Sequence, residues 1–408
     1  MSLILVYHDT EVPALYGAAA AAVAAARGSG FMHVSARFDT IRHADAIQHV
    51  VASGGLAASG LCWFERLSGK PVSPEATSDA ILDAARSADI VVPIHPVFLV
   101  EQNIVAALSS GAKARGIDVE TITVVDDGDT FRDVSTQSVL AWRDRFGRIT
   151  LIKSSGKPPT DLTIGIVGAE TDHHDVYPAV LACLADAADA LSLAIDIRFI
   201  DPVEFARSDD PETLRDLSGV LLPGGADMKN VPGQTAVAAF ALENALPTVG
   251  LCLGMQTMAT AVAWKTFGRR NANLAEADPD VAIKTFVAMA GETDASGMSL
   301  PSHRTGDQTM ETMANTYLSE VISSVAPVRC NHRFRLNPTI VPDLETNGLR
   351  VSARGLSGAV VDAIEVPGHV FFMGMQGHPE LSSRSGAPHP LIIAFLQAAT
   401  RNYQSTAS

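Results

Sequence analysis

The sequence is poor in charged and aromatic residues, and it lacks any long run of lysine or arginine. Charged residues make up 18% and aromatic residues 6% of the 408 residues, whereas apolar residues make up 47%. The formal net charge is −15. An acidic chain without a basic run cannot neutralise a phosphate backbone, so we expect no nucleic acid among its partners. The apolar content is high enough for large cores and argues against disorder.

The sequence begins with a short apolar run, from which we expect neither export nor membrane insertion. The first apolar run ends at His8 and Asp9, and no basic segment precedes it. Such a run is too short to direct export or to span a bilayer. We therefore expect a first buried strand in a cytoplasmic protein that does not bind membranes.

Cysteines are few and widely spaced, at Cys62, Cys183, Cys252 and Cys330. They show neither a C-x-x-C string nor another metal-ligand spacing, so we predict neither a disulfide framework nor a metal site. The cluster Asp172-His-His-Asp175 could supply metal ligands, but helix capping explains it better. The remaining question is which single cysteine is reactive.

Length and composition predict two domains, at roughly 150 residues per domain. A segment rich in Gly, Pro and Ser at 153–161 is the predicted linker. It separates residues 1–152 from residues 162–400, which leaves 401–408 as a tail. In the first domain, apolar runs alternate with expected helices, which favours a smaller α/β domain. The runs lie at 3–7, 89–94 and 119–125, and the helices at 18–26 and 78–87.

The second domain shows a repeated strand-then-helix pattern. This alternation predicts an α/β fold with a mostly parallel sheet covered by helices on both faces. The expected strands are 162–168, 194–200, 220–222 and 247–252, and the expected helices lie at about 175–190 and 233–244.

The string Gly250-Leu-Cys-Leu-Gly254 lies where a predicted strand meets a predicted helix. A G-x-C-x-G string in that position is typical of a nucleophile elbow with cysteine as the nucleophile. The turn is tight, so only small residues fit two positions before and two positions after Cys252. The amino end of the following helix would favour its thiolate form.

The string Gln376-Gly-His378-Pro-Glu380 offers the partners that such a nucleophile needs. A histidine oriented by a carboxylate can exchange protons with the attacking and leaving groups. Alone, Cys252 could equally be a buried structural thiol, and His378 a loop or core histidine. The two strings together, in the order Cys, His, Glu, favour catalysis.

Further strings accompany these two: Thr163–Gly168, Leu222–Gly225, Asn331–Asn337 and Ile364–Pro367. With them, residues 162–400 resemble the class I, or triad, glutamine amidotransferases, and within that family the glutaminase domain of CTP synthase. The resemblance implies a doubly wound, flavodoxin-like sheet. It also implies that a triad of Cys252, His378 and Glu380 hydrolyses the side-chain amide of glutamine.

The resemblance assigns further roles by position. Gly225 and Leu253 would offer backbone N–H groups to the oxyanion of the tetrahedral intermediate. Gln256 and Glu276 would hold the α-amino end of glutamine, and Arg333 would lie beside the substrate. A buried structural arginine is the alternative interpretation of Arg333.

The first domain departs from this family. The synthase domain of CTP synthase is longer and begins with a phosphate-binding loop, but residues 1–150 contain no G-x-x-x-x-G-K-[ST] string. We therefore expect no bound cofactor, neither ATP nor Mg²⁺, and no ATP-dependent synthesis of CTP. The segment 226–233 also departs from the pattern that joins glutaminase to synthase in the family.

Polar residues nevertheless follow the predicted strands of the first domain, at His8, Asp9, His95, Asp126 and Asp127. Open α/β sheets bind ligands at the carboxyl edge of their strands. These residues are therefore candidates for a site where a small molecule accepts ammonia. They are also ordinary turn and cap residues, and both interpretations stay open.

The sequence thus predicts a glutamine amidotransferase that releases ammonia at Cys252 and delivers it to a small-molecule acceptor at the first domain. One alternative is a γ-glutamyl hydrolase of the same fold, because Gln256, Glu276 and Arg333 would hold any γ-glutamyl group. The other is a non-catalytic glutamine-sensing or regulatory protein, which would not need a complete triad. The sequence identifies no acceptor and leaves a homo-oligomer open.

Overall fold

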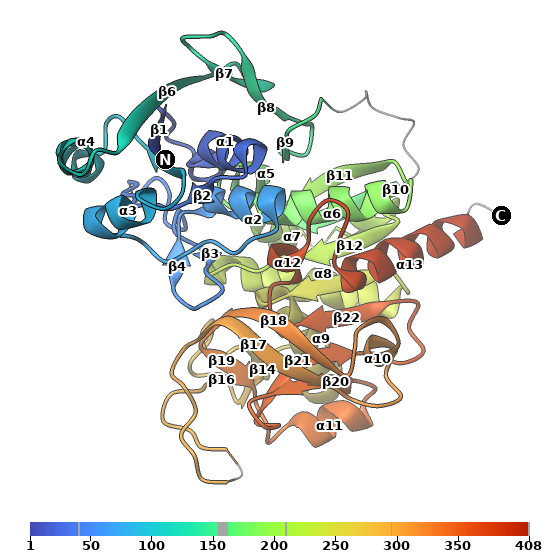
Figure 1. The fold of residues 1–408 in the computed structure, drawn as a ribbon. Helices are drawn as coiled ribbons and strands as arrows, with labels where there is room; N and C mark the ends of the chain where they lie inside the picture. Colours follow the sequence, from blue (N-terminus) through green and yellow to red (C-terminus); the bar gives the residue numbers. More distant parts are fainter. Residues whose placement is uncertain (40, 154–161, 209, 295, 407–408) are drawn as a thin grey trace. The chain divides into compact units, whose positions relative to one another are not determined.

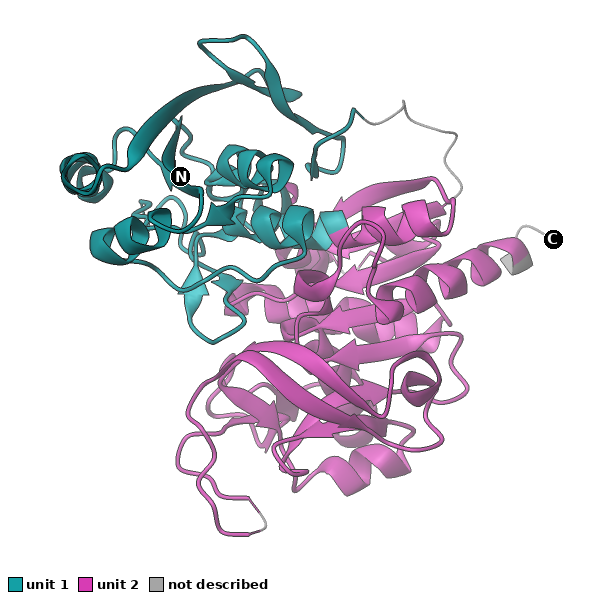
Figure 2. Cartoon of the chain, in the orientation of Figure 1, with its two compact units in different colours: residues 1–156, 171–182 teal, residues 157–170, 183–408 magenta. Residues whose placement is uncertain are grey.

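A computed structural model describes residues 1–39, 41–153, 162–208, 210–294 and 296–406 (Figure 1). The chain forms two compact units (Figure 2). Unit 1 contains residues 1–156 and 171–182, and unit 2 contains residues 157–170 and 183–408. Of the predicted linker, 154–161 lie outside the described residues. Residues 171–182, expected in the second domain, group with unit 1.

Unit 1 is built on a seven-stranded sheet in the order β2-β5-β1-β6-β7-β8-β9. The pairs among β2, β5, β1 and β6 are parallel, and the pairs from β6 to β9 are antiparallel. The strands are β1 Ser2–His8, β2 Gly30–Phe31, β5 Ile90–Ile94, β6 Asp118–Asp126, β7 Thr130–Asp133, β8 Val139–Arg143 and β9 Ile149–Thr150, beside a hairpin of β3 His49–Val50 and β4 Leu56–Ala57.

Helices cover both faces of the parallel part of this sheet. Successive side chains of a strand point to opposite faces. Ile4 and Val6 of β1 share a core cluster with α1 and α2, whereas Leu3 and Leu5 share one with α3 and α4. The helices are α1 Ala18–Arg27, α2 Cys62–Ser68, α3 Ser78–Ala85 and α4 Leu99–Arg115. Unit 1 is therefore an α/β unit, as the alternating pattern predicted.

Unit 2 contains a nine-stranded sheet in the order β11-β10-β12-β13-β22-β21-β20-β17-β18. The first five strands are parallel, and the remaining pairs are antiparallel. The strands are β10 Leu162–Val167, β11 Ile195–Ile200, β12 Gly219–Leu222, β13 Thr248–Leu251, β17 Arg304–Thr312, β18 Val325–His332, β20 Arg350–Gly355, β21 Val360–Glu365 and β22 Phe372–Met375. Two short pairs lie outside this sheet: β14 Ala272–Asn273 with β15 Ile283–Lys284, and β16 Phe286–Ala288 with β19 Phe334–Leu336.

The parallel strands of unit 2 also have helices on both faces. Val220 and Leu222 of β12 share a core cluster with α8 and α9. On the opposite face, a Cβ at Gly219 would lie 3.0 Å from the ring of Phe395 in α13. The helices that follow β10 along the chain are α5 Glu170–Asp175, α6 Pro178–Ala190, α7 Pro202–Ser208, α8 Val231–Glu243, α9 Leu253–Phe267, α10 Tyr317–Val321, α11 Val341–Thr346, α12 Pro379–Ser382 and α13 Pro390–Thr406. Of these, α5 from residue 171 onward and α6 up to residue 182 belong to unit 1.

These elements confirm the predicted α/β class, with a doubly wound parallel sheet in the second half of the chain. The antiparallel extensions of both sheets were not predicted. Helix α13 continues to Thr406, so it includes most of the segment 401–408 that was expected to be a tail. In the part of the chain that the structure describes, no helix combines the length and apolarity that crossing a bilayer requires.

Candidate active site

Cys252 forms the turn between β13 and α9. Its backbone has φ 50° and ψ −105°, a conformation that is strained for a residue with a side chain. Two glycines make room for this turn. A Cβ at Gly254 would lie 2.0 Å from the carbonyl oxygen of Leu222, and one at Gly250 would lie 2.4 Å from the sulfur of Met258. Larger residues would force the strand and helix apart, which explains the G-x-C-x-G string.

His378 precedes α12, and Glu380 lies in the first turn of that helix. Nδ1 of His378 is 2.7 Å from Oε1 of Glu380, whose side chain is buried. The backbone N–H of His378 donates to the carbonyl of Arg329 on β18, at 2.8 Å. The carboxylate therefore fixes the orientation of the imidazole and leaves Nε2 for other partners.

His378 and Cys252 lie next to each other. A Cβ at Gly224 would be 3.1 Å from Cε1 of His378 and 3.4 Å from Cβ of Cys252, so both residues flank the same glycine. Burial lowers the pKa of His378, but the charges of Glu380 and Cys252, and hydrogen bonds with both, raise it well above its ordinary value. The site thus favours an imidazolium beside the sulfur near neutral pH.

Two further polar groups contact the sulfur and were not predicted. Nε2 of Gln376 donates to Sγ of Cys252 at 3.8 Å, and Sγ lies 3.8 Å from the carbonyl oxygen of Asn331. Gln376 belongs to the same string as His378, so its position in the sequence was a signal. Its contact with Cys252 depends on β22 lying beside β13.

A buried ion pair lies behind this site and was also not predicted. Nη2 of Arg304 on β17 donates to Oδ2 of Asp362 on β21 at 2.9 Å. The pair crosses β20 at Gly355, where a Cβ would be 2.2 Å from Asp362 and 2.4 Å from Arg304. Nη1 of Arg304 is 3.5 Å from Nε2 of His332. Burial and the charge of Arg304 lower the pKa of His332 to about 3, so His332 stays neutral.

The residues expected to bind substrate differ in exposure. Gln256 is buried in the first turn of α9, and its backbone N–H donates to the carbonyl of Cys252 at 3.1 Å. Glu276 and Arg333 are exposed. Partial burial raises the pKa of Glu276, and the charge of Arg333 opposes this shift, so the two groups lie within electrostatic reach. The exposure of Arg333 excludes the alternative of a buried structural arginine.

The two expected oxyanion donors lie on either side of the turn. Leu253 is the first residue of α9, where backbone N–H groups have no partner within the helix. Gly225 follows β12, and a Cβ placed there would meet no atom within 4 Å. Leu253 directly follows Cys252, and Gly225 directly follows Gly224, which is flanked by Cys252 and His378.

In unit 1, the predicted acceptor residues follow three adjacent parallel strands, β5, β1 and β6. His8 and His95 are buried. Burial lowers the pKa of His8, and the nearby charge of Asp126 partly offsets this. Nε2 of His95 lies 2.9 Å from the carbonyl oxygen of Thr10 and 3.7 Å from Oδ1 of Asp9. The strand ends therefore bring these four side chains into one region.

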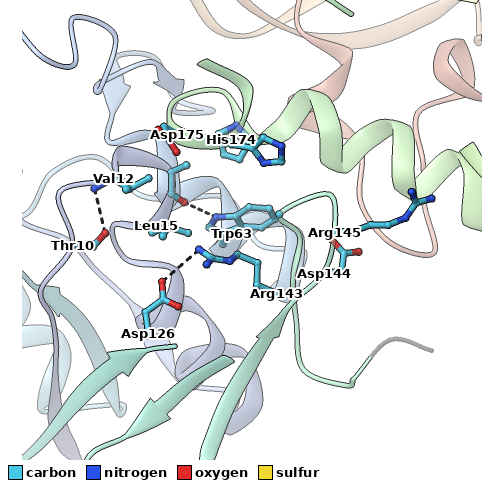
Figure 3. A pocket seen from close by; sticks show the side chains of 13 residues that line it. Thr10, Val12, Leu15, Trp63, Asp126, Arg143, Asp144, Arg145, His174 and Asp175 are labelled. Carbon is cyan, nitrogen blue, oxygen red and sulfur yellow. Dashed lines mark hydrogen bonds and ion pairs between the residues drawn. The ribbon is translucent and has the colours of Figure 1, made fainter. Parts of the chain in front are cut away.

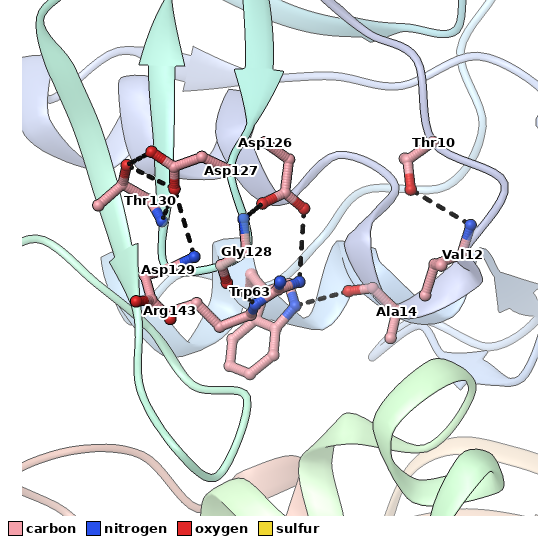
Figure 4. Close-up of polar contacts among 10 residues, drawn as sticks. All are labelled: Thr10, Val12, Ala14, Trp63, Asp126, Asp127, Gly128, Asp129, Thr130 and Arg143. Carbon is pink, nitrogen blue, oxygen red and sulfur yellow. Dashed lines mark hydrogen bonds and ion pairs between the residues drawn. The ribbon is translucent and has the colours of Figure 1, made fainter.

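Asp127 has a different environment. It accepts a hydrogen bond from the backbone N–H of Thr130 at 2.7 Å (Figure 4). It accepts another from Nε of Arg132 at 3.1 Å. The hydroxyl of Thr130 also donates to Asp127. This bond contributes most, and with the bonds from Arg132 and from the backbone it lowers the pKa of Asp127 to about 2. Asp127 therefore stabilises the turn between β6 and β7.

The cluster at 172–175 does not begin a helix, as a capping role would require, but lies inside α5. The carbonyl of Asp172 accepts the backbone N–H groups of Val176 and Tyr177. Within the described ranges, no group of three or more His, Cys, Asp or Glu side chains is arranged to hold a metal ion.

Comparisons with known proteins identify a family and several relatives for the part of the chain that includes Cys252. The sequence profile of the family described as Glutamine amidotransferase class-I matches residues 174–398. A CTP synthase from Thermus thermophilus is 32% identical over 248 residues, which cover 59% of this chain and 45% of that protein. CTP synthase from Hyphomonas neptunium is 34% identical over 260 residues, which cover 60% and 46%. The chain thus spans about half the length of the curated relatives it matches.

A solved structure is similar as well. It is the glutaminase domain of Trypanosoma brucei CTPS with bound acivicin, which matches with a TM-score of 0.54 and 27% sequence identity. The match covers 59% of this chain and 94% of that domain.

Proposed function

Since this chain belongs to the class I glutamine amidotransferase family, we propose that it hydrolyses the side-chain amide of glutamine, with Cys252 as the nucleophile. The observation that carries the proposal is the elbow: a strained cysteine at the amino end of α9, beside an imidazole that is held by a buried carboxylate. A structural thiol would need neither the strain nor the charged neighbour.

In the proposed reaction, the sulfur of Cys252 attacks the amide carbon of glutamine, and the oxyanion that forms accepts hydrogen bonds from the backbone N–H groups of Gly225 and Leu253. His378 gives its proton to the leaving ammonia as the C–N bond breaks. It then takes a proton from the water that hydrolyses the thioester, which releases glutamate and restores the thiolate. Glu380 keeps the imidazole in the required tautomer throughout.

Substrate selection is proposed to depend on Gln256, Glu276 and Arg333. A free amino acid carries one ammonium and one carboxylate, and the charges of Glu276 and Arg333 are complementary to these. Their exposure fits groups that contact a ligand and not the protein core. A γ-glutamyl amide would offer the same two charges, so it is the competing substrate to include in the assay.

We propose that the ammonia is delivered to a small-molecule acceptor at unit 1, where His8, Asp9, His95 and Asp126 are the candidate residues. The relatives named above are CTP synthases, but the proposal does not extend to CTP synthesis. Residues 1–150 have no phosphate-binding loop of the type that ATP-dependent activation in that family uses.

The experiment that tests the glutaminase is the release of glutamate and ammonia from glutamine by the purified chain, with Cys252→Ala as the paired variant. We expect release by the wild type and none by the variant. Equal release by both proteins would exclude Cys252 as the nucleophile. Absence of release by a folded wild-type protein, also with γ-glutamyl amides, would favour the sensing alternative.

A further inference from the structure

Unit 1 contains a cavity of about 540 Å³ that has no residue in common with the site around Cys252. Its walls come from the loop after β1, from α2, from the end of β6, from the loop after β8 and from residues 174–178 (Figure 3). Pockets that bind small molecules commonly have volumes of roughly 300–1,000 Å³. The cavity also lies at the carboxyl edge of β1 and β6, where open α/β sheets bind ligands.

One side of the cavity carries a guanidinium with unused donors. Nε of Arg143 donates to the carbonyl of Gly128 at 2.7 Å, and Nη1 lies 3.4 Å from Oδ2 of Asp126 (Figure 4). Asp126 also accepts the backbone N–H of Gly128 at 2.8 Å. These contacts fix the guanidinium, yet Nη2 makes no hydrogen bond to the residues that the structure describes. A planar fork held in this way is suited to a carboxylate.

A second element, α5, contributes an unpaired carboxylate. Asp175 is half-buried and has neither a hydrogen bond nor an ion pair with any described residue. Asp144, which also lines the cavity, is different because it accepts the backbone N–H and Nε of Arg148 at 2.9 and 2.8 Å. A half-buried carboxylate without a partner attracts a cation.

The balance of charge narrows the ligand class. The lining includes three aspartates, two arginines and no lysine. Arg143 already faces Asp126, so a polyphosphate would leave most of its charge uncompensated. A purely cationic ligand would leave the donors of Arg143 unused. A ligand with one negative and one positive group satisfies both Arg143 and Asp175. Val12, Leu15 and Pro178 supply apolar wall for the rest of such a molecule.

We propose that this cavity binds a small zwitterion of the amino acid class, with its carboxylate on Arg143 and its ammonium on Asp175. The inference goes beyond the proposed function, because it assigns a binding site in unit 1 and no chemical step. Binding itself requires no turnover, so it can be measured when the glutaminase is inactive.

The test is isothermal titration of the full-length Cys252→Ala protein with the common L-amino acids. Glutamine and glutamate are left out because the proposed glutaminase site would also bind them. We expect at least one amino acid to bind. Its N-acetyl and amide derivatives, which lack the ammonium and the carboxylate charge respectively, should each bind about tenfold or more weakly. ATP serves as the polyphosphate probe and should not bind at this cavity.

Two variants locate the binding. Arg143→Gln and Asp175→Asn should each weaken it about tenfold or more. Asp175 makes no bond within the described protein, so Asp175→Asn should fold normally even if Arg143→Gln does not. Arg132→Gln is the matched control, because Arg132 pairs with Asp127 in the same hairpin and does not line the cavity. It should change the affinity less than twofold.

The inference is wrong if no amino acid binds to the folded protein at millimolar concentrations. It is also wrong if neither Asp175→Asn nor Arg143→Gln changes the binding affinity. The inference is also wrong if ATP binds and these variants abolish that binding, because the ligand of the cavity would then be a polyphosphate and not a zwitterion. Wild-type glutaminase activity separates the two claims. Hydrolysis of glutamine without amino acid binding removes only the inference, whereas binding without hydrolysis removes only the proposed function.

Discussion

Both units place polar residues where parallel strands end, but they use these residues differently. In unit 2, Cys252 and Gln376 follow the neighbouring strands β13 and β22, and their side chains contact each other. In unit 1, His95 and Asp127 bond mainly to their own or adjacent loops. A strand edge therefore gathers polar groups in both units. Side chains from different strands also meet in unit 1, where Arg143 of β8 lies 3.4 Å from Asp126 of β6. A strained cysteine beside a charged imidazole is what distinguishes the candidate active site.

The buried charges differ in the same way. The carboxylate of Glu380 bonds to Nδ1 of His378 and orients that ring beside the sulfur of Cys252. In unit 1, Glu101 is buried and accepts the hydroxyl of Tyr16 at 3.0 Å and the backbone N–H of His95. Burial raises the pKa of Glu101 to about 7. That carboxylate stabilises the loop after β5, so a buried charge alone does not indicate catalysis.

The largest effect is expected from His378→Asn, which should lower kcat for glutamine hydrolysis about 10⁴-fold or more. The variant loses the proton donor for ammonia and the charge beside the sulfur. Initial rates of glutamate release measure this. His95→Asn in unit 1 is the matched control and should leave the glutaminase rate within about twofold of wild type. If His378→Asn lowers kcat no more than His95→Asn does, His378 has no catalytic role and the two units do not differ in the way described.

A loss of about 10²- to 10⁴-fold in kcat is expected for Glu380→Gln. Glu380 makes the largest contribution that raises the pKa of His378. Without this carboxylate, the pKa of His378 should fall. The basic limb of the variant's pH profile should therefore lie at a lower pH than that of the wild type. The measurement is a pH profile of kcat/KM for both proteins. An unchanged basic limb would contradict the assigned role of Glu380.

Glu365→Gln is the control for that profile. Glu365 is a buried carboxylate of the same unit, and it accepts the backbone N–H groups of Tyr317 and Leu318 at 3.2 Å. Among the described residues, no hydrogen bond or ion pair joins Glu365 to the candidate site. Its loss should therefore lower stability and leave the position of the basic limb unchanged.

A weaker effect, about 10- to 100-fold in KM with kcat nearly unchanged, is expected for Arg333→Ala. The charge of Arg333 would act equally on bound glutamine and on the transition state. Steady-state kinetics separate the two constants. Arg215→Ala, at an exposed arginine paired with Glu212, should change neither. A fall in kcat alone would place Arg333 in the chemical step.

The smallest effect concerns stability. The pKa of His332 is about 3 in the folded protein and near 6.5 when unfolded. Between pH 6.5 and 3 the unfolded chain therefore binds a proton at His332 that the folded chain does not. The contribution of His332 to the free energy of unfolding is fully present above pH 6.5 and is lost as the pH falls toward 3. The slope is at most about 1.4 kcal/mol per pH unit for this group. Melting temperatures at pH 7 and 4.5 should fall less for His332→Gln than for wild type, and an equal fall would contradict this account.

Local sequence predicted the elements that depend on local geometry. The elbow at Cys252 follows from glycines two positions before and two positions after it, and most parallel strands of both units follow from short apolar runs. The pairing of His378 with Glu380 was also predictable, because the two residues lie close together in the chain at the start of one helix.

Contacts between distant segments were not predictable in this way. Gln376 meets Cys252 only because β22 lies beside β13. Arg304 and Asp362 meet across an intervening strand, at a position where Gly355 leaves space. The cavity of unit 1 has walls from five separate segments, including a hairpin that the apolar pattern did not indicate. Strand order decides each of these, and a single sequence does not specify it.

The most direct test of the central claim is the intact mass of the wild-type and Cys252→Ala proteins after treatment with a glutamine-analogue electrophile. Burial raises the pKa of Cys62 and of Cys330 to about 12, so these thiols should stay unreactive. We predict one adduct on the wild type and none on Cys252→Ala. Equal labelling of both proteins, or no labelling of a folded wild-type protein, would contradict the assignment of Cys252 as the nucleophile.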